Sequence, residues 1–252
     1  MKKLILLVAT ACAVCSCDLS NLLGRIVKGD GVSVDVPCEV DDFAAISSVG
    51  SIDVFYTQAP GEQSVTLTCD QNLVEYYQVE VERGILFVSV KPGYILSPKT
   101  KSFLTVSSPA LNGISITGSG DCFVSGQVVT DGDLIFKLSG SGNLDMDGSL
   151  SCKALECKLT GSGDARIKEA VSESAALSTM GSGNISVNSI TAETISVTST
   201  GSGDGVLGCK DAGDINVRLT GSGSVTLTGN ARSLTEKVNG SGRVNKRGLE
   251  LR

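Results

Sequence analysis

The most regular chemical pattern in this chain is a series of acids and amides that follow a repeated tripeptide, Gly-Ser-Gly. The tripeptide recurs at intervals of 22, 21, 20, 20, 20 and 19 residues, beginning at Gly118, Gly140, Gly161, Gly181, Gly201, Gly221 and Gly240. The residues that follow it are Asp121, Asn143, Asp164, Asn184 and Asp204, then Ser224 and Arg243. Carboxylates and amides can form hydrogen-bonded stacks, and their oxygens are also ligands for calcium. Their chemistry therefore depends on whether equivalent residues stack.

The period of about 20 residues predicts a solenoid. In the repeat that begins at Gly181, residues 184–188 and 194–198 alternate between polar and apolar side chains, which indicates two short strands joined by a polar turn. A unit of this size is too small for a propeller blade of about 40 residues. We therefore expect an all-β fold, a single-stranded parallel β-helix, in which each strand pairs with its equivalent about 4.8 Å away in the next coil.

Gly-Ser-Gly suits a tight corner, because glycine adopts backbone angles closed to other residues and lets stacked backbones approach closely. The serine hydroxyl can hydrogen-bond to the serine of the adjacent coil. If the residues after the corners also stack, each Asn separates two carboxylates and supplies donors between them. The glycine-rich calcium-binding repeats have a nine-residue period with an Asp in each repeat, and this chain has neither. We expect a structural ladder rather than a metal site.

An enzymatic alternative rests on Asp145 and Asp147, an acid pair at strand spacing. Many β-helices cleave acidic glycans, so a polysaccharide lyase or hydrolase, or a glycan-binding module, is the competing interpretation. Glycosidases use paired carboxylates and commonly stack sugar rings on aromatic side chains. Residues 137–252 contain no aromatic residue and the chain has no His, while an exposed turn beside Gly148 accounts for both acids. We expect no catalytic residues and no cofactor.

The N-terminus predicts export and lipid attachment. Lys2 and Lys3 precede an apolar run from Leu4 to Val14 that is too short to span a bilayer and fits a signal peptide over residues 1–16. The run ends in Val14-Cys15-Ser16-Cys17, which resembles a bacterial lipobox and marks Cys17 as the lipid attachment residue. Residues 17–32 are expected to be a tether, so that the membrane is a partner through the lipid alone.

Charge and cysteine content narrow the functional classes further. The chain has a formal net charge of −6, and its acidity argues against nucleic acid as a partner. Six cysteines follow Cys17, none with zinc-site spacing. We expect buried free thiols, with a disulfide between Cys152 and Cys157 as the alternative.

The chain divides by composition at about residue 110. Residues 33–110 contain all five prolines and several alternating segments, and they are expected to form the first coils or a strand-rich cap. A short helix is predicted over residues 72–77, and residues 91–101 are expected to be an exposed basic loop. Residues 111–252 form the regular coils, and residues 33–252 are expected to be one continuous domain.

The order of these motifs resembles the head GIN domain family, described as putative auto-transporter adhesins and found mainly in the Bacteroidetes. The resemblance covers most of residues 35–245. It rests on residues 43–46, 50–56, 84–88 and 111–121, followed by the repeated Gly-Ser-Gly. It implies a right-handed β-helix without an established activity. We therefore expect a non-enzymatic, lipid-anchored envelope protein, on the outer membrane, that binds a protein or glycan in an adhesin-like role.

Overall fold

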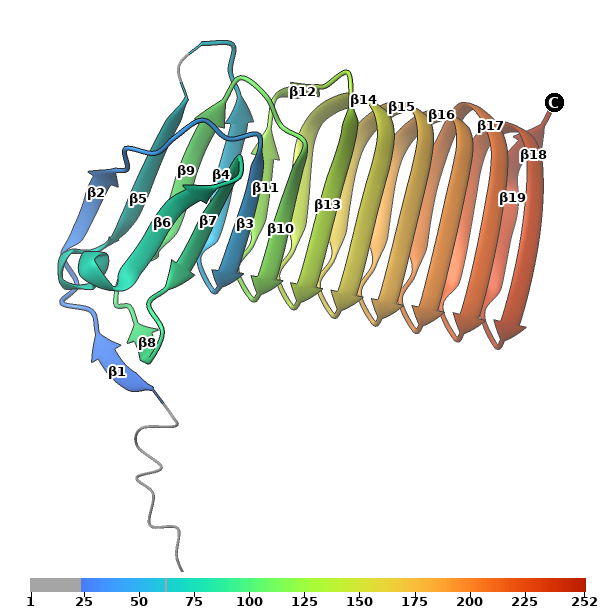
Figure 1. Ribbon diagram of the computed structural model, residues 1–252. Helices are drawn as coiled ribbons and strands as arrows, with labels where there is room; N and C mark the ends of the chain where they lie inside the picture. The colour runs from blue at the N-terminus through green and yellow to red at the C-terminus, as the bar shows by residue number, and fades with distance from the viewer. Residues whose placement is uncertain (1–23, 62) are drawn as a thin grey trace, which may run out of the picture.

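The protein is a β-solenoid of about seven turns, with coils of about 20 residues, as the sequence predicts. The computed structural model describes residues 24–61 and 63–252, with 73% strand and 3% helix. Seventeen strands of the described residues form one continuous sheet that winds along the long axis of the solenoid (Figure 1). No helix among the described residues has the length and apolar character needed to cross a membrane.

Each regular coil is one long, bent strand rather than the two strands predicted. The coils are β14 (Leu144–Gly161), β15 (Ala165–Gly181), β16 (Ile185–Gly201), β17 (Gly205–Gly221) and β18 (Ser224–Gly240), followed by β19 (Arg243–Leu251). Neighbouring coils pair in parallel, with Gly181 opposite Gly201. Residues at the bend pair as well, Ala170 with Ile190, so hydrogen bonding between coils continues where the sequence predicts a turn.

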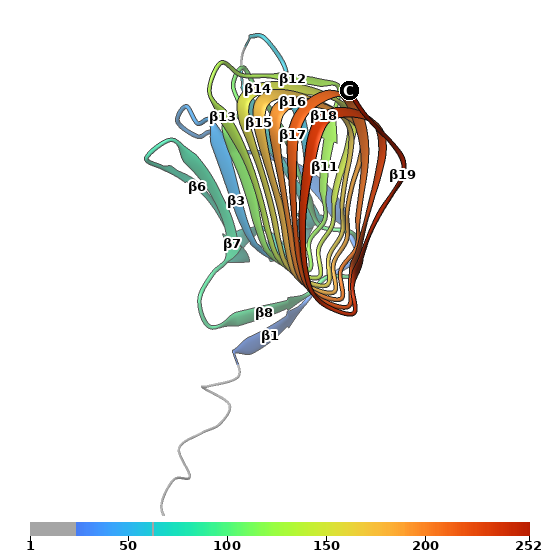
Figure 2. The ribbon, with the colours of Figure 1, turned by 90° about the vertical axis from the view of Figure 1, so that its right-hand side faces the viewer.

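In cross-section each coil has two long sides that meet at the Gly-Ser-Gly corner and are joined at the opposite end by a wide bend (Figure 2). The front face, toward the viewer in Figure 1, comprises the second halves of β14–β18 together with β7 (Ile85–Val90), β3 (Ala45–Gly50), β10 (Gly113–Gly118) and β13 (Asp133–Gly140). The back face comprises the first halves of β14–β18 together with β19, β9 (Phe103–Ser108), β4 (Asp53–Gln58) and β11 (Cys122–Ser125). Alternate residues of both faces, such as Ile185 and Ile195, are buried between them in one continuous core.

The first coils do not stack in chain order. β3 (Ala45–Gly50) and β4 (Asp53–Gln58) turn a corner at Gly50, and β10 (Gly113–Gly118) and β11 (Cys122–Ser125) stack on them around the next corner, at Gly118. β12 (Gln127–Val129) and β13 (Asp133–Gly140) continue this coil, so that β13 pairs with β10 one coil further along. β7 (Ile85–Val90) and β9 (Phe103–Ser108) pair in parallel with the other edges of β3 and β4. Residues 85–108, which come later in the chain, therefore stack at the outer edge of residues 45–58.

Antiparallel strands cover this end of the solenoid. β5 (Ser64–Asp70) pairs with β9, β2 (Ser33–Pro37) pairs with β5, and β6 (Tyr77–Glu82) pairs with β7. The helix predicted at residues 72–77 is a 3₁₀ helix, η2 (Gln71–Tyr76), whose Leu73 is buried. Because these strands run against the direction of the coils, they end the parallel stack and protect its edge.

The described part of the predicted tether is fixed to this end. β1 (Arg25–Lys28) pairs with β8 (Tyr94–Ser97), which lies inside the segment predicted to be a loop. The buried carboxylate of Asp70 accepts hydrogen bonds from the backbone N–H groups of Gly31, Lys99 and Thr100 and from the Thr100 hydroxyl. A Cβ at Gly29 would collide with this carboxylate. Asp70 therefore joins the N-terminal strand and the β8 segment to the end of β5.

Asp70→Asn is expected to lower the melting temperature at neutral pH, because an amide NH₂ would face backbone donors. Burial raises the pKa of Asp70, but its hydrogen bonds outweigh that effect and hold the pKa below its ordinary value. The stabilisation is therefore complete above the unfolded-state pKa of about 4 and is lost as the pH falls through the lower folded value. Thermal unfolding between pH 2 and 7 would show a shallower acid slope in the variant, and identical slopes would contradict this assignment.

Candidate functional site

The Gly-Ser-Gly corners are held together by backbone hydrogen bonds. At one corner the carbonyl oxygen of Gly181 accepts from the N–H of Ser202 at 2.9 Å and from the N–H of Gly203 at 3.2 Å. The same two bonds recur along the stack: the first pair joins the corner at Gly118 to the carbonyl of Gly50, and the last pair joins the corner at Gly221 to the carbonyl of Gly201. The serine side chains are exposed, and no hydrogen bond joins their hydroxyls among the described residues. The predicted serine ladder is therefore wrong, because the backbone amides make these contacts.

Close approach between backbones explains both glycines of the motif. A Cβ on Gly201 would collide with the carbonyl oxygen of Gly181, and a Cβ on Gly203 would collide with that of Gly183. Gly201 also has φ of +122°, a conformation that L side chains rarely adopt. The first glycine is thus required for conformation and space, and the second for space alone.

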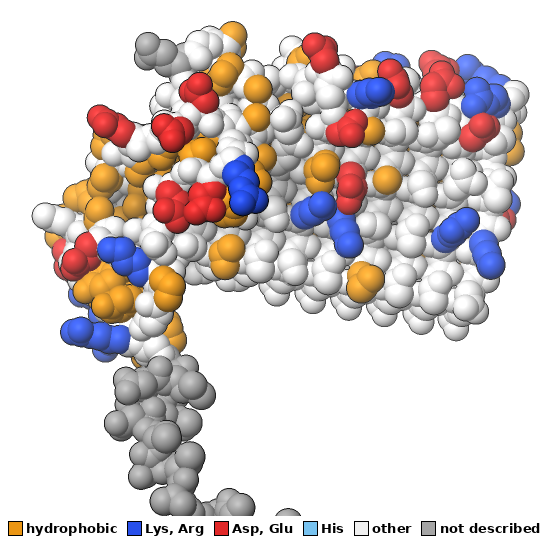
Figure 3. All heavy atoms as spheres, viewed as in Figure 1, with side chains coloured by type: hydrophobic (Ala, Val, Ile, Leu, Met, Phe, Trp, Pro, Cys, Tyr) orange, Lys and Arg blue, Asp and Glu red, His pale blue; other side chains and the backbone are white. Residues whose placement is uncertain are grey.

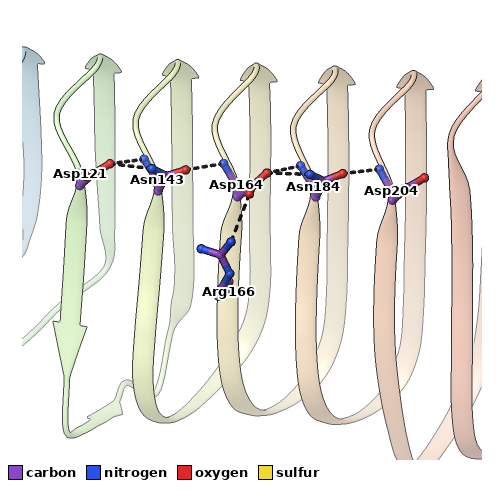
Figure 4. A network of polar contacts seen from close by, with 6 residues as sticks. All are labelled: Asp121, Asn143, Asp164, Arg166, Asn184 and Asp204. Carbon is purple, nitrogen blue, oxygen red and sulfur yellow. Dashed lines mark hydrogen bonds and ion pairs between the residues drawn. The ribbon is translucent and has the colours of Figure 1, made fainter.

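The residues after the corners form the stacked series shown in Figure 4, here called the corner ladder. The side-chain amide of Asn143 donates to Asp121 Oδ1 at 2.9 Å, and its backbone N–H donates to the same atom at 2.8 Å. Asn184 repeats both bonds to Asp164 Oδ1, at 2.8 and 3.0 Å. The Asn oxygens in turn accept the backbone N–H groups of Asp164 and Asp204. The structure therefore brings together all five predicted ladder residues.

The ladder is longer at both ends than the five predicted positions. Asp53 Oδ1 accepts the backbone N–H of Asp121 at 2.9 Å, and Asp204 Oδ1 accepts that of Ser224 at 2.6 Å. Asp53 was missed because Ile52 replaces the second glycine, although Gly50-Ser51 precedes it at the usual spacing. Asp53 and Asp121 are neighbours without an amide between them, so the alternation does not extend to this end.

The chemistry of the ladder is that of a structural network. Each ladder oxygen described above points along the solenoid toward a donor of the next coil, and Arg166 makes an ion pair with Asp164 at 3.3 Å. The described residues contain no group of three or more His, Cys, Asp or Glu side chains arranged to hold a metal ion. Because Asn143 and Asn184 lie between them, Asp121, Asp164 and Asp204 are each two coils from the next acid.

The acid pair of the enzymatic alternative lies on the surface. Asp145 and Asp147 are exposed positions of β14 that alternate with the buried Leu144 and Met146. Asp145 pairs in register with Arg166, and Asp147 falls at the register shift between Met146 and Ser149, so both belong to the strand rather than to a turn. Neither side chain is enclosed, so the structure gives the pair no sheltered cleft.

The six cysteines that follow Cys17 are free, and the alternative disulfide between Cys152 and Cys157 is not formed. Burial raises the pKa of Cys69, Cys152 and Cys209 to about 11 and that of Cys157 to about 12. Burial also raises the pKa of Cys122 and of Cys38, which is only half-buried. These thiols therefore resemble core side chains rather than nucleophiles. Cys17, the predicted lipid attachment residue, lies outside the described residues.

Alanine substitutions would separate conformation from space at the corners. Gly201→Ala should be most destabilising, because it adds a collision to a strained φ, and Gly203→Ala should suffer the collision alone. Gly126→Ala is the control for strain, since its φ is +76° in open space, and should cost about 1–2 kcal/mol. Gly132→Ala has neither problem and should be nearly neutral. Urea unfolding would rank the four, and a Gly203→Ala variant as stable as Gly132→Ala would contradict the close-approach argument.

A second substitution tests the ladder. Asn184→Asp would remove the amide donor to Asp164 and place three carboxylates in consecutive coils, with each new repulsion worth about 1 kcal/mol when solvated. Thermal unfolding should show a loss of stability at low salt and partial recovery at high salt. Asn188→Asp adds the same charge in the same coil outside the ladder and is the control. Equal stability of both variants at low salt would refute the ladder's role, and a rise in melting temperature with added calcium would indicate a metal site instead.

Comparisons with known proteins agree with this architecture. A crystal structure of a putative adhesin from Bacteroides fragilis NCTC 9343 is similar, with 27% identity, coverage of 87% of this chain and 99% of that chain, and a TM-score of 0.80. A putative lipid binding protein from Parabacteroides distasonis ATCC 8503 has 23% identity, coverage of 88% and 99%, and a TM-score of 0.75. A putative adhesin from Parabacteroides merdae ATCC 43184 has 22% identity, coverage of 88% and 98%, and a TM-score of 0.64. The last two show the fold alone.

None of these three proteins is named as an enzyme, and no curated protein sequence matches the chain. The family model for the head GIN domain, described as a putative auto-transporter adhesin, matches residues 42–204 and 167–252. Those two matches take in the first corner at Gly50, the ladder and every Gly-Ser-Gly coil. This chain belongs to the head GIN domain family.

Proposed function

We propose that this protein is a non-enzymatic lipoprotein of the cell envelope that presents its solenoid for adhesin-like binding. The observation that carries the proposal is the separation of the two ends. β1 lies beside the antiparallel strands at one end, while the regular coils extend from there to β18 and β19 (Figure 1). A lipid on Cys17 would attach the chain through the β1 end and leave the long faces of the coils accessible.

The surface chemistry of the coils supports binding rather than catalysis. One row of outward positions on the front face near the corners carries Thr160, Thr200 and Thr220, with the exposed Met180 between the first two. Repeated polar side chains on a rigid scaffold suit many weak contacts with an extended partner. The exposed Asp145 and Asp147, by contrast, lack the enclosure of a glycosidase site. Family membership and the named adhesins among similar structures favour the same class of function.

Cys17→Ala is expected to move the protein out of the membrane fraction or to block its processing, because the lipid is the proposed attachment. Fractionation combined with metabolic labelling by a fatty acid would measure both effects. Cys38→Ala is the matched control, since it removes a mature-chain cysteine without touching the lipobox. Equal fatty-acid labelling of the wild type and the Cys17→Ala variant would rule out lipid attachment at Cys17. Outer-membrane location would be tested by separating the two membranes in the same experiment.

A further inference from the structure

One row of outward positions on the front face carries four cations. Strand register aligns Lys137 with Lys158, and Arg218 with Lys237, with Ser178 and Thr198 in the two coils between these pairs. All four basic side chains, here called the basic row, are exposed. Figure 3 shows two pairs of basic side chains along this face, separated by uncharged surface.

The basic row has no acidic partners within the described part of the chain. Among the other cations of the regular coils, Arg166 pairs with Asp164, Arg232 with Asp214 and Lys246 with Glu236. Five more form no ion pair with a described residue: Lys153, Lys168, Lys210, Arg243 and Arg247. None of the ion pairs formed by described residues involves the basic row. Like charges directly opposite each other on neighbouring strands are destabilising. The row thus concentrates positive charge at a cost to folding.

A shallow groove runs beside the row. Its first part, of about 430 Å³, is lined by Ala45, Gly113, Ile135 and Lys137, and its second part, of about 290 Å³, extends from Ile135 toward Asn216. Small side chains such as Ala176 and Ser196 form its floor. Asp133 lines the second part on the side away from the row, whereas Glu156 stands in the floor itself, in register with Ile135 and Ala176. Both carboxylates can accept hydrogen bonds from hydroxyl groups.

We propose that the groove and the basic row bind a linear acidic polysaccharide along the axis of the solenoid. Sugar rings would lie on the floor of the groove, with their carboxylates toward the basic row and their hydroxyls toward Asp133 on the far side and Glu156 and Asn216 in the floor. A polymer with acids on one edge and hydroxyls elsewhere matches this arrangement. Within each basic pair, the two cations belong to parallel coils about 4.8 Å apart along the polymer.

This groove is less suited to the other common linear polyanion, a nucleic acid. Single-stranded nucleic acids are held by aromatic side chains that stack on successive bases. Phe87 lines the first part of the groove, but no aromatic residue occurs from residue 137 to the C-terminus. The coils that carry most of the row therefore offer no stacking platform. An anionic membrane would meet the whole face, including Asp133 and Glu156, rather than a single line of cations.

Binding of polygalacturonate oligosaccharides to the full-length protein in a neutral detergent would test the proposal, with the carboxyl-reduced oligosaccharides as the matched control ligand. Isothermal titration calorimetry should show binding of the acidic oligosaccharides that weakens with added salt, and at least about fivefold weaker binding of the reduced form. No binding of the acidic form, or equal binding of both, would overturn the proposal.

The row itself is tested by Lys137→Ser combined with Lys158→Ser, which copies the Ser178 of the same row. Affinity should fall about two- to fivefold for each cation removed, the range expected for exposed ion pairs. Lys168→Ser combined with Arg247→Ser removes the same charge from exposed positions outside the row and should leave affinity almost unchanged. The row variant should also melt at or above the wild-type temperature, because like-charge repulsion is relieved. Equal loss of affinity in both double variants would refute the assignment of the row.

Single-stranded DNA and vesicles of anionic phospholipid complete the experiment. Tighter binding of either one than of the oligosaccharides, abolished in the row variant, would replace the polysaccharide as the ligand class. The inference rests on the proposed function only in one respect, the cellular compartment in which the protein would encounter the polysaccharide. A failed Cys17 experiment would therefore remove envelope attachment without touching the binding result, and a failed binding experiment would leave attachment intact.

Discussion

The structure depends on the close approach of successive backbones at the Gly-Ser-Gly corners. Parallel hydrogen bonding sets the coils about 4.8 Å apart, and at that spacing the carbonyl of Gly181 occupies the space that a Cβ on Gly201 would need. Each corner thus fixes the register of the coil that follows it. As a consequence, the nearest neighbour of an outward side chain is the residue about 20 positions away, and the surface is organised in rows along the axis.

The rows deal with charge in two different ways. In the corner ladder, Asn143 and Asn184 separate the acids, and their side-chain amides donate hydrogen bonds to Asp121 and Asp164. These carboxylates therefore find hydrogen-bond donors within the ladder. In the basic row, Lys137 and Lys158 are adjacent and have no such partners. Both rows are built on the same scaffold with the same spacing. The two rows therefore differ only in their side chains. Those of the corner ladder bond to one another and hold coils together, whereas those of the basic row are suited to an external anion.

The sequence predicts what repeats locally and misses what depends on distant pairing. Gly-Ser-Gly spacing was sufficient for the coils and for the stacking of Asp164, Asn184 and Asp204. The stacking of residues 85–108 outside residues 45–58 has no local signal, because it is a pairing between separate segments. Asp53 was hidden by one substitution in the motif. The basic row was hidden because its successive members lie 19 to 60 residues apart in a chain whose net charge is −6.

The antiparallel end of the solenoid completes the argument for a binding role. Stacked coils contact only their neighbours, so a repeat protein is most easily opened from its ends. If Cys17 carries the membrane attachment, any pull on the bound solenoid enters at the β1 end. There Asp70 joins the segments at Gly31, Lys99 and Thr100, and β5 joins them to β9. Several hydrogen bonds would then have to break before the first parallel coil is loaded, which would protect the coils that present the proposed binding row.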